Sequence, residues 1–234
     1  ESEFYEYKDA SPDGIGKFYM GREISHVMGH PGASWLERPL RDREEKTSRL
    51  VQNLPLQPGN MVADIGAGTG YFSFRLAERL PQGTVMAVDI QQEMLDIIES
   101  RKLEGYSGNV ETVLGTERDP KLRAASVDLI LLVDAYHEFS WPREMGEAMS
   151  MALKPGGRLI YVTCSLLPEE NTDQIEAFLT SNPEFSILPY AGVWRECLPD
   201  DPPASSDGST DTLLLSPADH NVDGFFVAVM QRQG

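Results

Sequence analysis

A glycine-rich turn between an apolar segment and a helical pattern constrains this chain more than any other feature. Residues 61–65 are mostly apolar, include Asp64, and are followed by apolar residues at helical spacing over residues 71–80. Three glycines separate the two patterns: Gly66, Gly68 and Gly70. Glycine permits a sharp turn and close approach of a ligand, and the following helix offers unpaired N–H groups at its start. The segment therefore predicts a strand, a ligand-binding turn and a helix.

Strand and helix patterns alternate from this point onward. The expected strands cover residues 61–65, 84–90, 110–114, 127–133, 158–163, 212–215 and 224–230. The expected helices cover residues 71–80, 91–103, 142–153 and 168–179. Residues 127–133 are almost continuously apolar, which is typical of a parallel strand buried on both faces. The pattern predicts an α/β fold with a seven-stranded, mostly parallel sheet and helices on both faces.

The first 54 residues do not share this alternation. An irregular lead-in is expected over residues 1–17, and helices are expected near residues 21–28 and 41–54, the second ending before Pro55. We therefore divide the chain into an N-terminal irregular and helical segment, residues 1–54, and a ligand-binding domain, residues 55–234. The N-terminal segment is either a lid over the substrate site or a helix packed on the domain edge.

Carboxylates follow the first three expected strands. Asp64 would crowd a pyrophosphate, but it suits the amino group of a methionine moiety. Asp89 ends the second strand beside Ile90, where a carboxylate can accept hydrogen bonds from both ribose hydroxyls. Glu117 is expected to accept from an adenine amino group, with Asp119 as the substitute. The glycine spacing, G-x-G-x-G, also differs from the G-x-G-x-x-G of dinucleotide sites.

These elements resemble the class I S-adenosylmethionine-dependent methyltransferases. The likeness also includes a strand that ends in Val133-Asp134-Ala135 and the turn Leu153-Lys154-Pro155-Gly156-Gly157. It implies a Rossmann-like class I methyltransferase fold, S-adenosyl-L-methionine as cofactor and methyltransferase activity. The resemblance implies cofactor contacts from Asp64, Gly66, Gly68, Gly70, Asp89, Ile90, Glu117 and Asp134. A nicotinamide-binding Rossmann domain and a related domain without activity are the alternatives.

Polar residues after the fourth strand should border the transferable methyl group, because ligands in open α/β sheets lie at the carboxyl ends of the strands. His137 is the candidate general base because its charge changes near neutral pH, and a structural role is the alternative. Glu138 is expected to cap or orient a neighbour. An apolar lid of Phe18, Tyr19 and Met20 is a further hypothesis for this side of the site.

Two parts of the chain carry different resemblances. Residues 12–153 resemble a family of small uncharacterised bacterial methyltransferases, through segments such as Ala135-Tyr136-His137-Glu138-Phe139. The last third resembles the ribosomal RNA cytosine methyltransferases that modify ring carbon five, through Tyr161-Val162-Thr163-Cys164-Ser165 and the residues that follow. The chain is therefore either a recombinant of two related folds or one fold whose tail supplies the last helix and strands.

The second resemblance implies a catalytic role for Cys164. In the cytosine methyltransferases the cysteine of Thr-Cys-Ser is the nucleophile, and Cys164 matches that position. The chain lacks that family's Pro-Cys pair after the fourth strand, where it has Ala135-Tyr136, and it lacks the family's glycine-loop sequence. The alternative is that Cys164 is a small core or edge residue.

Net charge separates the possible acceptors. The chain has 37 acidic and 20 basic residues, a net charge of −17, which disfavours a bare polyanionic partner such as RNA. We therefore expect methyl transfer to a small molecule. The alternatives are ribosomal RNA cytosine carbon-5 methylation through Cys164 and a cofactor-binding module without turnover.

Neither a metal site nor a membrane partner is expected. The two cysteines, Cys164 and Cys197, form no zinc pattern, and His26 and His30 lack a third ligand. No apolar run approaches the roughly 18 residues that would span a bilayer. A cytoplasmic location is expected, with an exported protein as the alternative because the chain begins at Glu1. The sequence does not predict an oligomeric state.

Overall fold

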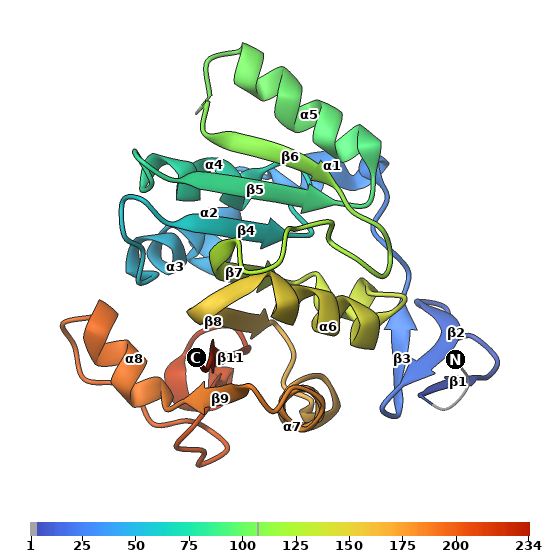
Figure 1. The fold of residues 1–234 in the computed structure, drawn as a ribbon. Helices are drawn as coiled ribbons and strands as arrows, with labels where there is room; N and C mark the ends of the chain where they lie inside the picture. The colour runs from blue at the N-terminus through green and yellow to red at the C-terminus, as the bar shows by residue number, and fades with distance from the viewer. Residues whose placement is uncertain (1–3, 107) are drawn as a thin grey trace.

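A large mixed β-sheet with helices on both faces dominates the computed structural model, which describes residues 4–106 and 108–234 (Figure 1). The strand order is β10-β11-β8-β7-β4-β5-β6, and β9 also pairs with β11. The strands are β4 (Met61–Ile65), β5 (Thr84–Asp89), β6 (Val110–Leu114), β7 (Val127–Val133), β8 (Leu153–Thr163), β9 (Phe185–Leu188), β10 (Leu213–Leu215) and β11 (Phe225–Arg232).

Five neighbouring strands of this sheet run parallel. β6, β5, β4, β7 and β8 pair in parallel, whereas β11 is antiparallel to β8, β9 and β10. The expected α/β fold with a mostly parallel sheet is confirmed. The prediction of seven strands omits β9, because a four-residue segment between Pro183 and Pro189 is too short to show a clear alternation.

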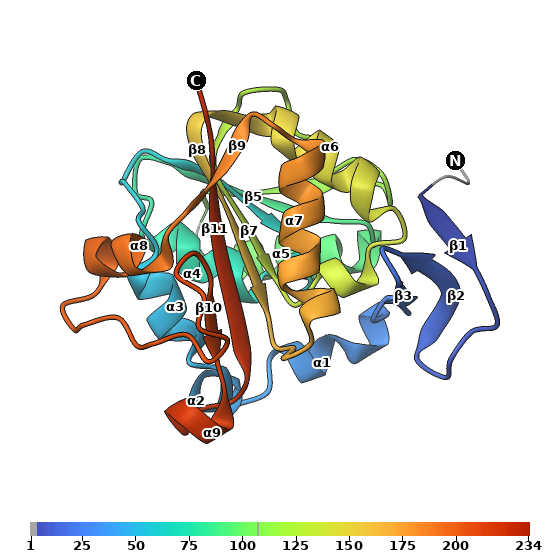
Figure 2. The same ribbon diagram turned by 90° about the horizontal axis from the view of Figure 1, so that it is seen from below.

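Helices cover both faces of the sheet, as Figure 2 also shows. The helices are α1 (Ala33–Leu36), α2 (Arg41–Glu45), α3 (Thr47–Asn53), α4 (Tyr71–Glu78), α5 (Gln92–Leu103), α6 (Pro142–Ala152), α7 (Thr172–Ser181), α8 (Tyr190–Cys197) and α9 (Pro217–His220), with 3-10 turns η1 (His30–Gly32), η2 (Tyr136–Glu138) and η3 (Pro168–Glu170). Within the described ranges, no helix has the length and apolar character needed to cross a bilayer.

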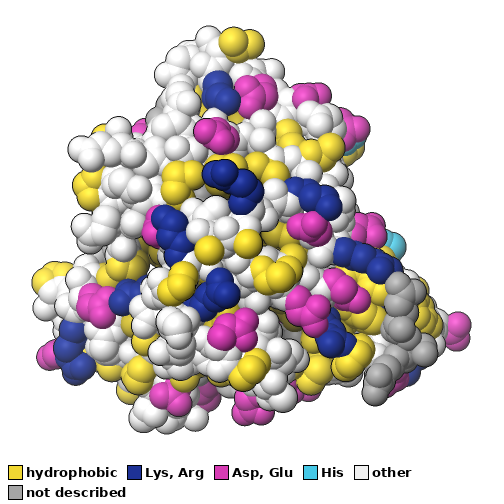
Figure 3. Space-filling model, viewed as in Figure 1, with side chains coloured by type: hydrophobic (Ala, Val, Ile, Leu, Met, Phe, Trp, Pro, Cys, Tyr) yellow, Lys and Arg dark blue, Asp and Glu magenta, His cyan; other side chains and the backbone are white. Residues whose placement is uncertain are grey.

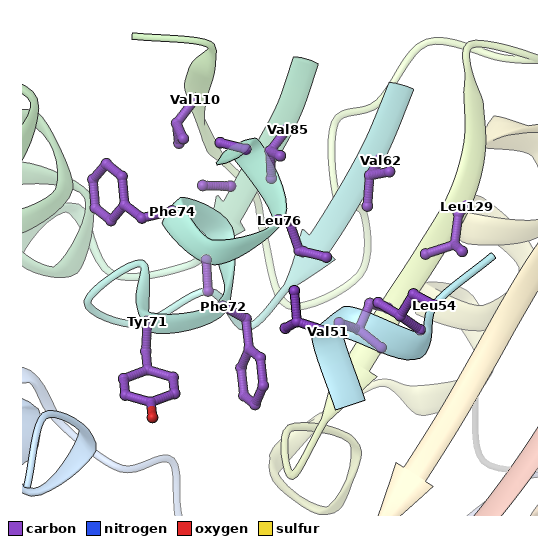
Figure 4. Close-up of a cluster of buried hydrophobic side chains, with 14 of the residues drawn as sticks. Val51, Leu54, Val62, Tyr71, Phe72, Phe74, Leu76, Val85, Val110 and Leu129 are labelled. Carbon is purple, nitrogen blue, oxygen red and sulfur yellow. The ribbon is translucent and has the colours of Figure 1, made fainter. Parts of the chain in front are cut away.

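Two apolar layers hold the sheet between these helices. Successive side chains of a strand point to opposite faces, so Val62 and Leu129 pack with α3, α4 and α5, whereas Ala63 and Ile130 pack with α6 and α7. Figure 4 shows part of the first layer, in which Val51 of α3 and Leu76 of α4 lie near each other. Because both faces are buried, the edge at the carboxyl ends of the parallel strands is the place left for a ligand.

A second, antiparallel sheet occupies the start of the chain. It contains β1 (Tyr5–Tyr7), β2 (Gly14–Tyr19) and β3 (Arg22–Ser25). The prediction of an irregular stretch over residues 1–17 is wrong at β1 and β2 and holds at residues 8–13, and its first three residues lie outside the described range. The prediction of a helix near residues 21–28 is wrong, because residues 22–25 form β3. Met20 and Gly21 have φ angles of 53° and 82° and form a two-residue hairpin turn. Such turns require positive φ at both positions and match the twist of the paired strands, which overrides the weak helical spacing.

The small sheet is fixed to the loop that follows β7. The Lys17 ammonium is buried and donates to the Ser140 carbonyl at 2.6 Å. It also lies 3.0 Å from the centre of the Trp141 ring and 4.1 Å from that of Tyr5. The Tyr5 hydroxyl donates to the Glu144 carboxylate of α6. These contacts place the N-terminal sheet against the segment that borders the candidate site.

The expected single helix over residues 41–54 is broken in two. Lys46 has a φ of 54°, in the left-handed region, and separates α2 from α3. The Asp42 carboxylate accepts from the Ser48 N–H at 2.6 Å and from the Thr47 hydroxyl at 2.9 Å. A carboxylate that caps the second helix favours this break over a continuous helix.

Candidate cofactor and methyl-transfer site

A cavity of about 390 Å³ lies at the carboxyl ends of β4, β5 and β7. From β4 the chain adds β5 and β6 on one side of the sheet, and then crosses to add β7 and β8 on the other side. The strand order therefore reverses between β4 and β7, and ligands of open α/β sheets bind at such a point. Seven of the eight predicted cofactor residues line it: Asp64, Gly66, Gly68, Asp89, Ile90, Glu117 and Asp134. Both candidate catalytic residues, His137 and Cys164, line the same cavity. Gly70 does not; it is the residue before α4.

The glycine turn after β4 is shaped by two close contacts. Gly66 and Gly68 have φ angles of 75° and 54°. A Cβ at Gly66 would lie 2.6 Å from the Ala135 side chain, and one at Gly68 would lie 2.7 Å from the Leu36 side chain. Both positions therefore need glycine for space as well as for backbone conformation. The turn passes between the loop after β7 and helix α1, and it forms one wall of the cavity.

The Asp89 carboxylate holds the turn after β4 and the start of the loop after β5, and it can still accept hydrogen bonds from a ligand. Its carboxylate accepts from the Gly68 N–H at 2.9 Å and from the Gln91 N–H at 2.9 Å. An ionised carboxylate has about four acceptor positions, so two remain for a ligand with two neighbouring hydroxyls. The side chain is 8% exposed, and its burial raises the pKa. These features fit a ribose.

Two further buried carboxylates line the cavity. Asp64 accepts from the Ser73 hydroxyl at 2.6 Å, and burial raises its pKa to about 6. Asp134 has a φ of 52°, and its Oδ1 atom is buried without a hydrogen-bond partner among the described residues. Burial raises the pKa of Asp134 as well. Buried acceptors of this kind need a partner, and an ammonium group supplies one. These two carboxylates therefore fit the aminoacyl end of S-adenosylmethionine, whose ammonium group donates hydrogen bonds.

Glu117 is better placed for a ligand than its substitute. Glu117 lies on the cavity wall. Asp119 instead accepts from the backbone N–H of Lys121 at 2.7 Å and from its ammonium at 2.8 Å. Of the two acids that the sequence left open, Glu117 is the one that we propose as the adenine contact.

Cys164 and Asp134 form a pair at the carboxyl end of β8. Cys164 is exposed on the cavity wall, and the negative charge of Asp134 acts on its thiol. Partial burial and the nearby carboxylate raise the pKa of Cys164 to about 11. The thiol is therefore protonated at neutral pH when no cation occupies the cavity, and a bound cation would favour the thiolate.

His137 and Glu138 are two titratable groups on the cavity wall. Burial and the Arg22 charge lower the pKa of His137, so its imidazole is neutral at pH 7 and can accept a proton. Burial raises the pKa of Glu138 to about 7. Arg22 of β3 donates to the His137 carbonyl at 3.4 Å and lies 3.8 Å from Glu170. The N-terminal sheet thereby helps to position η2.

Part of the N-terminal segment contributes to the wall of the cavity. Residues 27–41, here called the strap, contribute Val27, Met28, Trp35, Leu36 and Arg41 to its wall. The Gln91 side chain donates to the Met28 carbonyl at 3.0 Å and accepts from the His30 N–H at 2.9 Å. Farther along, Glu37 accepts from the Thr69 hydroxyl at 2.5 Å. The strap is thus fixed to the loops after β4 and β5.

The expected lid of Phe18, Tyr19 and Met20 is not on the wall of this cavity. Tyr19 is buried instead, 5.5 Å from the ring of Tyr5. The lid was predicted because these three residues are apolar. In the structure, Tyr19 packs in the core of the small sheet instead. The aromatic residues that do line the cavity are Trp35, Tyr71, Phe72 and Phe139, and Trp35 is 56% exposed.

The Cys164–Asp134 pair predicts how thiol reactivity depends on pH. In a Cys197→Ser background, alkylation of Cys164 by iodoacetamide is expected to accelerate about tenfold per pH unit from pH 7 to 9, because the thiolate is the reactive form and the thiol pKa is about 11. Asp134→Asn removes a negative charge that raises this pKa, so alkylation at pH 8 should become faster. Asp96→Asn, on the exposed side of α5, is the control, and an equal rate in the two variants would contradict the pairing.

Two family models match successive parts of the chain. Residues 62–157 match the methyltransferase domain family, and residues 140–231 match the 16S rRNA methyltransferase RsmB/F family. The ribosomal RNA small subunit methyltransferase B of Vibrio cholerae is 26% identical over 201 residues, 76% of this chain and 42% of that protein. The protein of the same name from Klebsiella pneumoniae is 32% identical over 157 residues, 56% of this chain and 36% of that protein. The chain spans less than half the length of these curated relatives.

Solved structures share the fold. A SAM-dependent methyltransferase from Aquifex aeolicus superposes with a TM-score of 0.67 and 18% identity, covering 88% of this chain and 100% of that one. NSun6 from Pyrococcus horikoshii, solved with SFG, superposes with a TM-score of 0.59 and 20% identity, covering 80% of this chain and 52% of that one. At these identities, the likeness concerns the fold alone.

The fold, the acidic cavity and the methyltransferase family match define the chain as a class I S-adenosylmethionine-dependent methyltransferase. Within that class it resembles the ribosomal RNA cytosine carbon-5 methyltransferases, because its second part matches the RsmB/F family. The expected fold, enzyme class and cofactor are confirmed. The curated relatives are named as ribosomal RNA methyltransferases, so they give no support to the small-molecule acceptor that net charge suggested.

Proposed function

We propose that this chain methylates carbon five of a cytosine in RNA and uses Cys164 as the nucleophile. The observation that carries the proposal is the position of Cys164, which lies on the wall of the cofactor cavity together with Asp134. The RsmB/F family match spans this residue, and the curated relatives named above are ribosomal RNA methyltransferases.

Carbon five of cytosine needs activation before it can attack an electrophile. Addition of the Cys164 thiolate to ring carbon six forms a carbon–sulfur bond and makes carbon five electron-rich. The thiol proton has a near acceptor in Asp134, whose pKa is raised by burial so that it holds a proton more readily than an exposed aspartate. When bound, S-adenosylmethionine supplies an electrophilic methyl group and a positive charge beside the thiolate.

The adduct must then lose the proton of carbon five. After methyl transfer, a base removes this proton, the ring double bond re-forms and the bond between carbon six and Cys164 breaks. His137 and Glu138 both line the cavity, and the neutral His137 imidazole is able to accept a proton at pH 7. We assign the base role to His137, with Glu138 close by at 3.8 Å from its ring nitrogen.

Proton loss from carbon five gives the test. A small-subunit ribosomal RNA transcript labelled with tritium at carbon five of cytosine is incubated with the protein and S-adenosylmethionine at low ionic strength. Tritium release to water is expected to equal the methyl groups incorporated into the RNA. A transcript labelled at carbon five of uridine is the control and should release none. Methyl incorporation without tritium release would contradict carbon-five methylation.

A small-molecule acceptor is the second candidate, and the charge of the chain favours it. The net charge is −17, and Figure 3 shows Lys and Arg side chains interspersed with Asp and Glu on the face it displays. Such a surface attracts a nucleic-acid backbone weakly. Methyl transfer to members of a small-molecule panel, with none to RNA at low ionic strength, would favour this candidate.

A further inference from the structure

One guanidinium lies on the wall of an otherwise acidic cavity. Arg41 is the sole Lys or Arg among the described residues that line it. The acids on the wall are Asp64, Asp89, Glu117, Asp134 and Glu138. S-adenosylmethionine has two cationic groups, the ammonium and the sulfonium, and one carboxylate. The acids match the cations, and only Arg41 offers a positive charge to the carboxylate.

The side chain of Arg41 is held in one orientation. It is 5% exposed, its Nε donates to Glu45 at 2.9 Å, and its Nη1 donates to the Leu36 carbonyl at 3.0 Å. The guanidinium lies 4.3 Å from the centre of the Tyr71 ring and 5.2 Å from that of Phe72. Within the part of the chain that the structure describes, no hydrogen bond is made by its Nη2 atom. One donor of a fixed, buried guanidinium is thus available to a ligand.

The position of Arg41 matches the aminoacyl end of the cavity. Its positive charge acts on both carboxylates. Burial raises the pKa of Asp64 and of Asp134, and the Arg41 charge offsets part of this rise. Arg41 therefore lies close to the two acids that suit the ammonium group, and the carboxylate of the same amino acid moiety must lie near them.

We propose that Arg41 binds the carboxylate of the methionine moiety of S-adenosylmethionine through Nη2, and that it selects this cofactor over analogues that lack the carboxylate. The interaction also ties the strap to the bound ligand, because Arg41 is its last residue and holds the Leu36 carbonyl within it. The proposal rests on the cofactor and not on the RNA acceptor.

The test compares two ligands that differ only in the carboxylate. Isothermal titration calorimetry measures the affinity of the whole chain for S-adenosylmethionine and for decarboxylated S-adenosylmethionine. The wild-type chain is expected to prefer S-adenosylmethionine by about 10- to 100-fold, the range of one charge-assisted hydrogen bond in a buried site. Arg41→Met should lose this preference through weaker binding of S-adenosylmethionine, while the affinity for the decarboxylated ligand changes less than about twofold.

A second arginine on the same ring provides the matched control. Arg75 lies 3.6 Å from the Tyr71 ring centre and donates to the Tyr71 carbonyl at 2.7 Å, but it does not line the cavity. Arg75→Met should keep the wild-type preference. Arg41→Lys, which keeps the charge and loses the planar fork, should keep part of it. Equal weakening of both ligands in Arg41→Met would overturn the proposal, because a purely structural role predicts that result.

The wild-type measurement keeps the test decisive if Arg41→Met fails to fold. A chain that binds both ligands equally has no carboxylate contact to lose, and the proposal is then wrong. Since no acceptor is present, RNA methylation can fail while the ligand preference remains, and the reverse outcome is equally distinguishable.

Discussion

Asp89→Asn is expected to weaken S-adenosylmethionine binding by at least about 100-fold. The carboxylate has two acceptor positions left after its bonds to the Gly68 and Gln91 N–H groups, and we assign them to the two ribose hydroxyls. Each charge-assisted hydrogen bond contributes roughly 1.5–3 kcal/mol, so losing both corresponds to a factor of about 100 or more. The amide also brings an NH₂ group toward backbone donors, which disturbs the glycine turn. Calorimetry with the purified variant measures the change.

Asp96→Asn is the matched control for this substitution. Asp96 is exposed on α5 and accepts from the Gln92 side chain, so the same change of residue there leaves the cavity intact. Its affinity should stay within about twofold of wild type. Thermal unfolding of the Asp89→Asn chain without ligand shows whether the fold survives. A folded Asp89→Asn variant that binds S-adenosylmethionine normally would place the ribose elsewhere and refute the assignment of this end of the cavity.

The cofactor side of the site could be predicted from the sequence because its residues follow directly from local structure. Strand ends in a parallel sheet meet at one edge, so Asp64, Asp89 and Asp134 had to lie together once the strands were recognised. Gly66 and Gly68 likewise mark a turn whose φ angles glycine readily adopts. Gly70 shows the limit of the argument, since it has the same conformation but faces Phe74 and Ile98 rather than the ligand.

The N-terminal part of the site could not be predicted in this way. Its residues reach the cavity through tertiary contacts such as those of Gln91 with Met28 and His30, which leave no periodic pattern in the sequence. Arg41 shows the same difficulty. It lies four residues before Glu45, a spacing that is typical of an exposed ion pair on a helix. Only the fold shows that this pair is buried and that it borders an acidic cavity.

Net charge is weak evidence for the acceptor, because it describes the whole surface and not the reactive centre. A value of −17 weakens general attraction to RNA but has no bearing on how a base would be held at the thiol. The resemblance of the last third was the more informative feature, since it identified Cys164, and the structure places this thiol in the same cavity as the carboxylates from the first strands.

Cys164→Ala is expected to reduce methyl transfer to RNA by at least about a thousandfold, because removal of a covalent nucleophile removes the step that activates carbon five. Cys164→Ser should behave almost identically, since a hydroxyl is a far weaker nucleophile than a thiolate. The thiol is exposed on the cavity wall, so both variants should fold and bind S-adenosylmethionine within about twofold of wild type. Incorporation of labelled methyl groups into ribosomal RNA and calorimetry measure the two effects.

A fluorinated substrate separates loss of the nucleophile from general damage to the site. RNA containing 5-fluorocytosine has no proton to lose at carbon five, so a thiol bonded to carbon six stays attached after methyl transfer. Wild-type chain and the control Cys197→Ser, which changes the other cysteine and leaves the cavity wall unaltered, should give a protein–RNA adduct that survives denaturation. Cys164→Ala should give none. Substantial transfer by Cys164→Ala, or an adduct formed without this residue, would show that the base is methylated by another route.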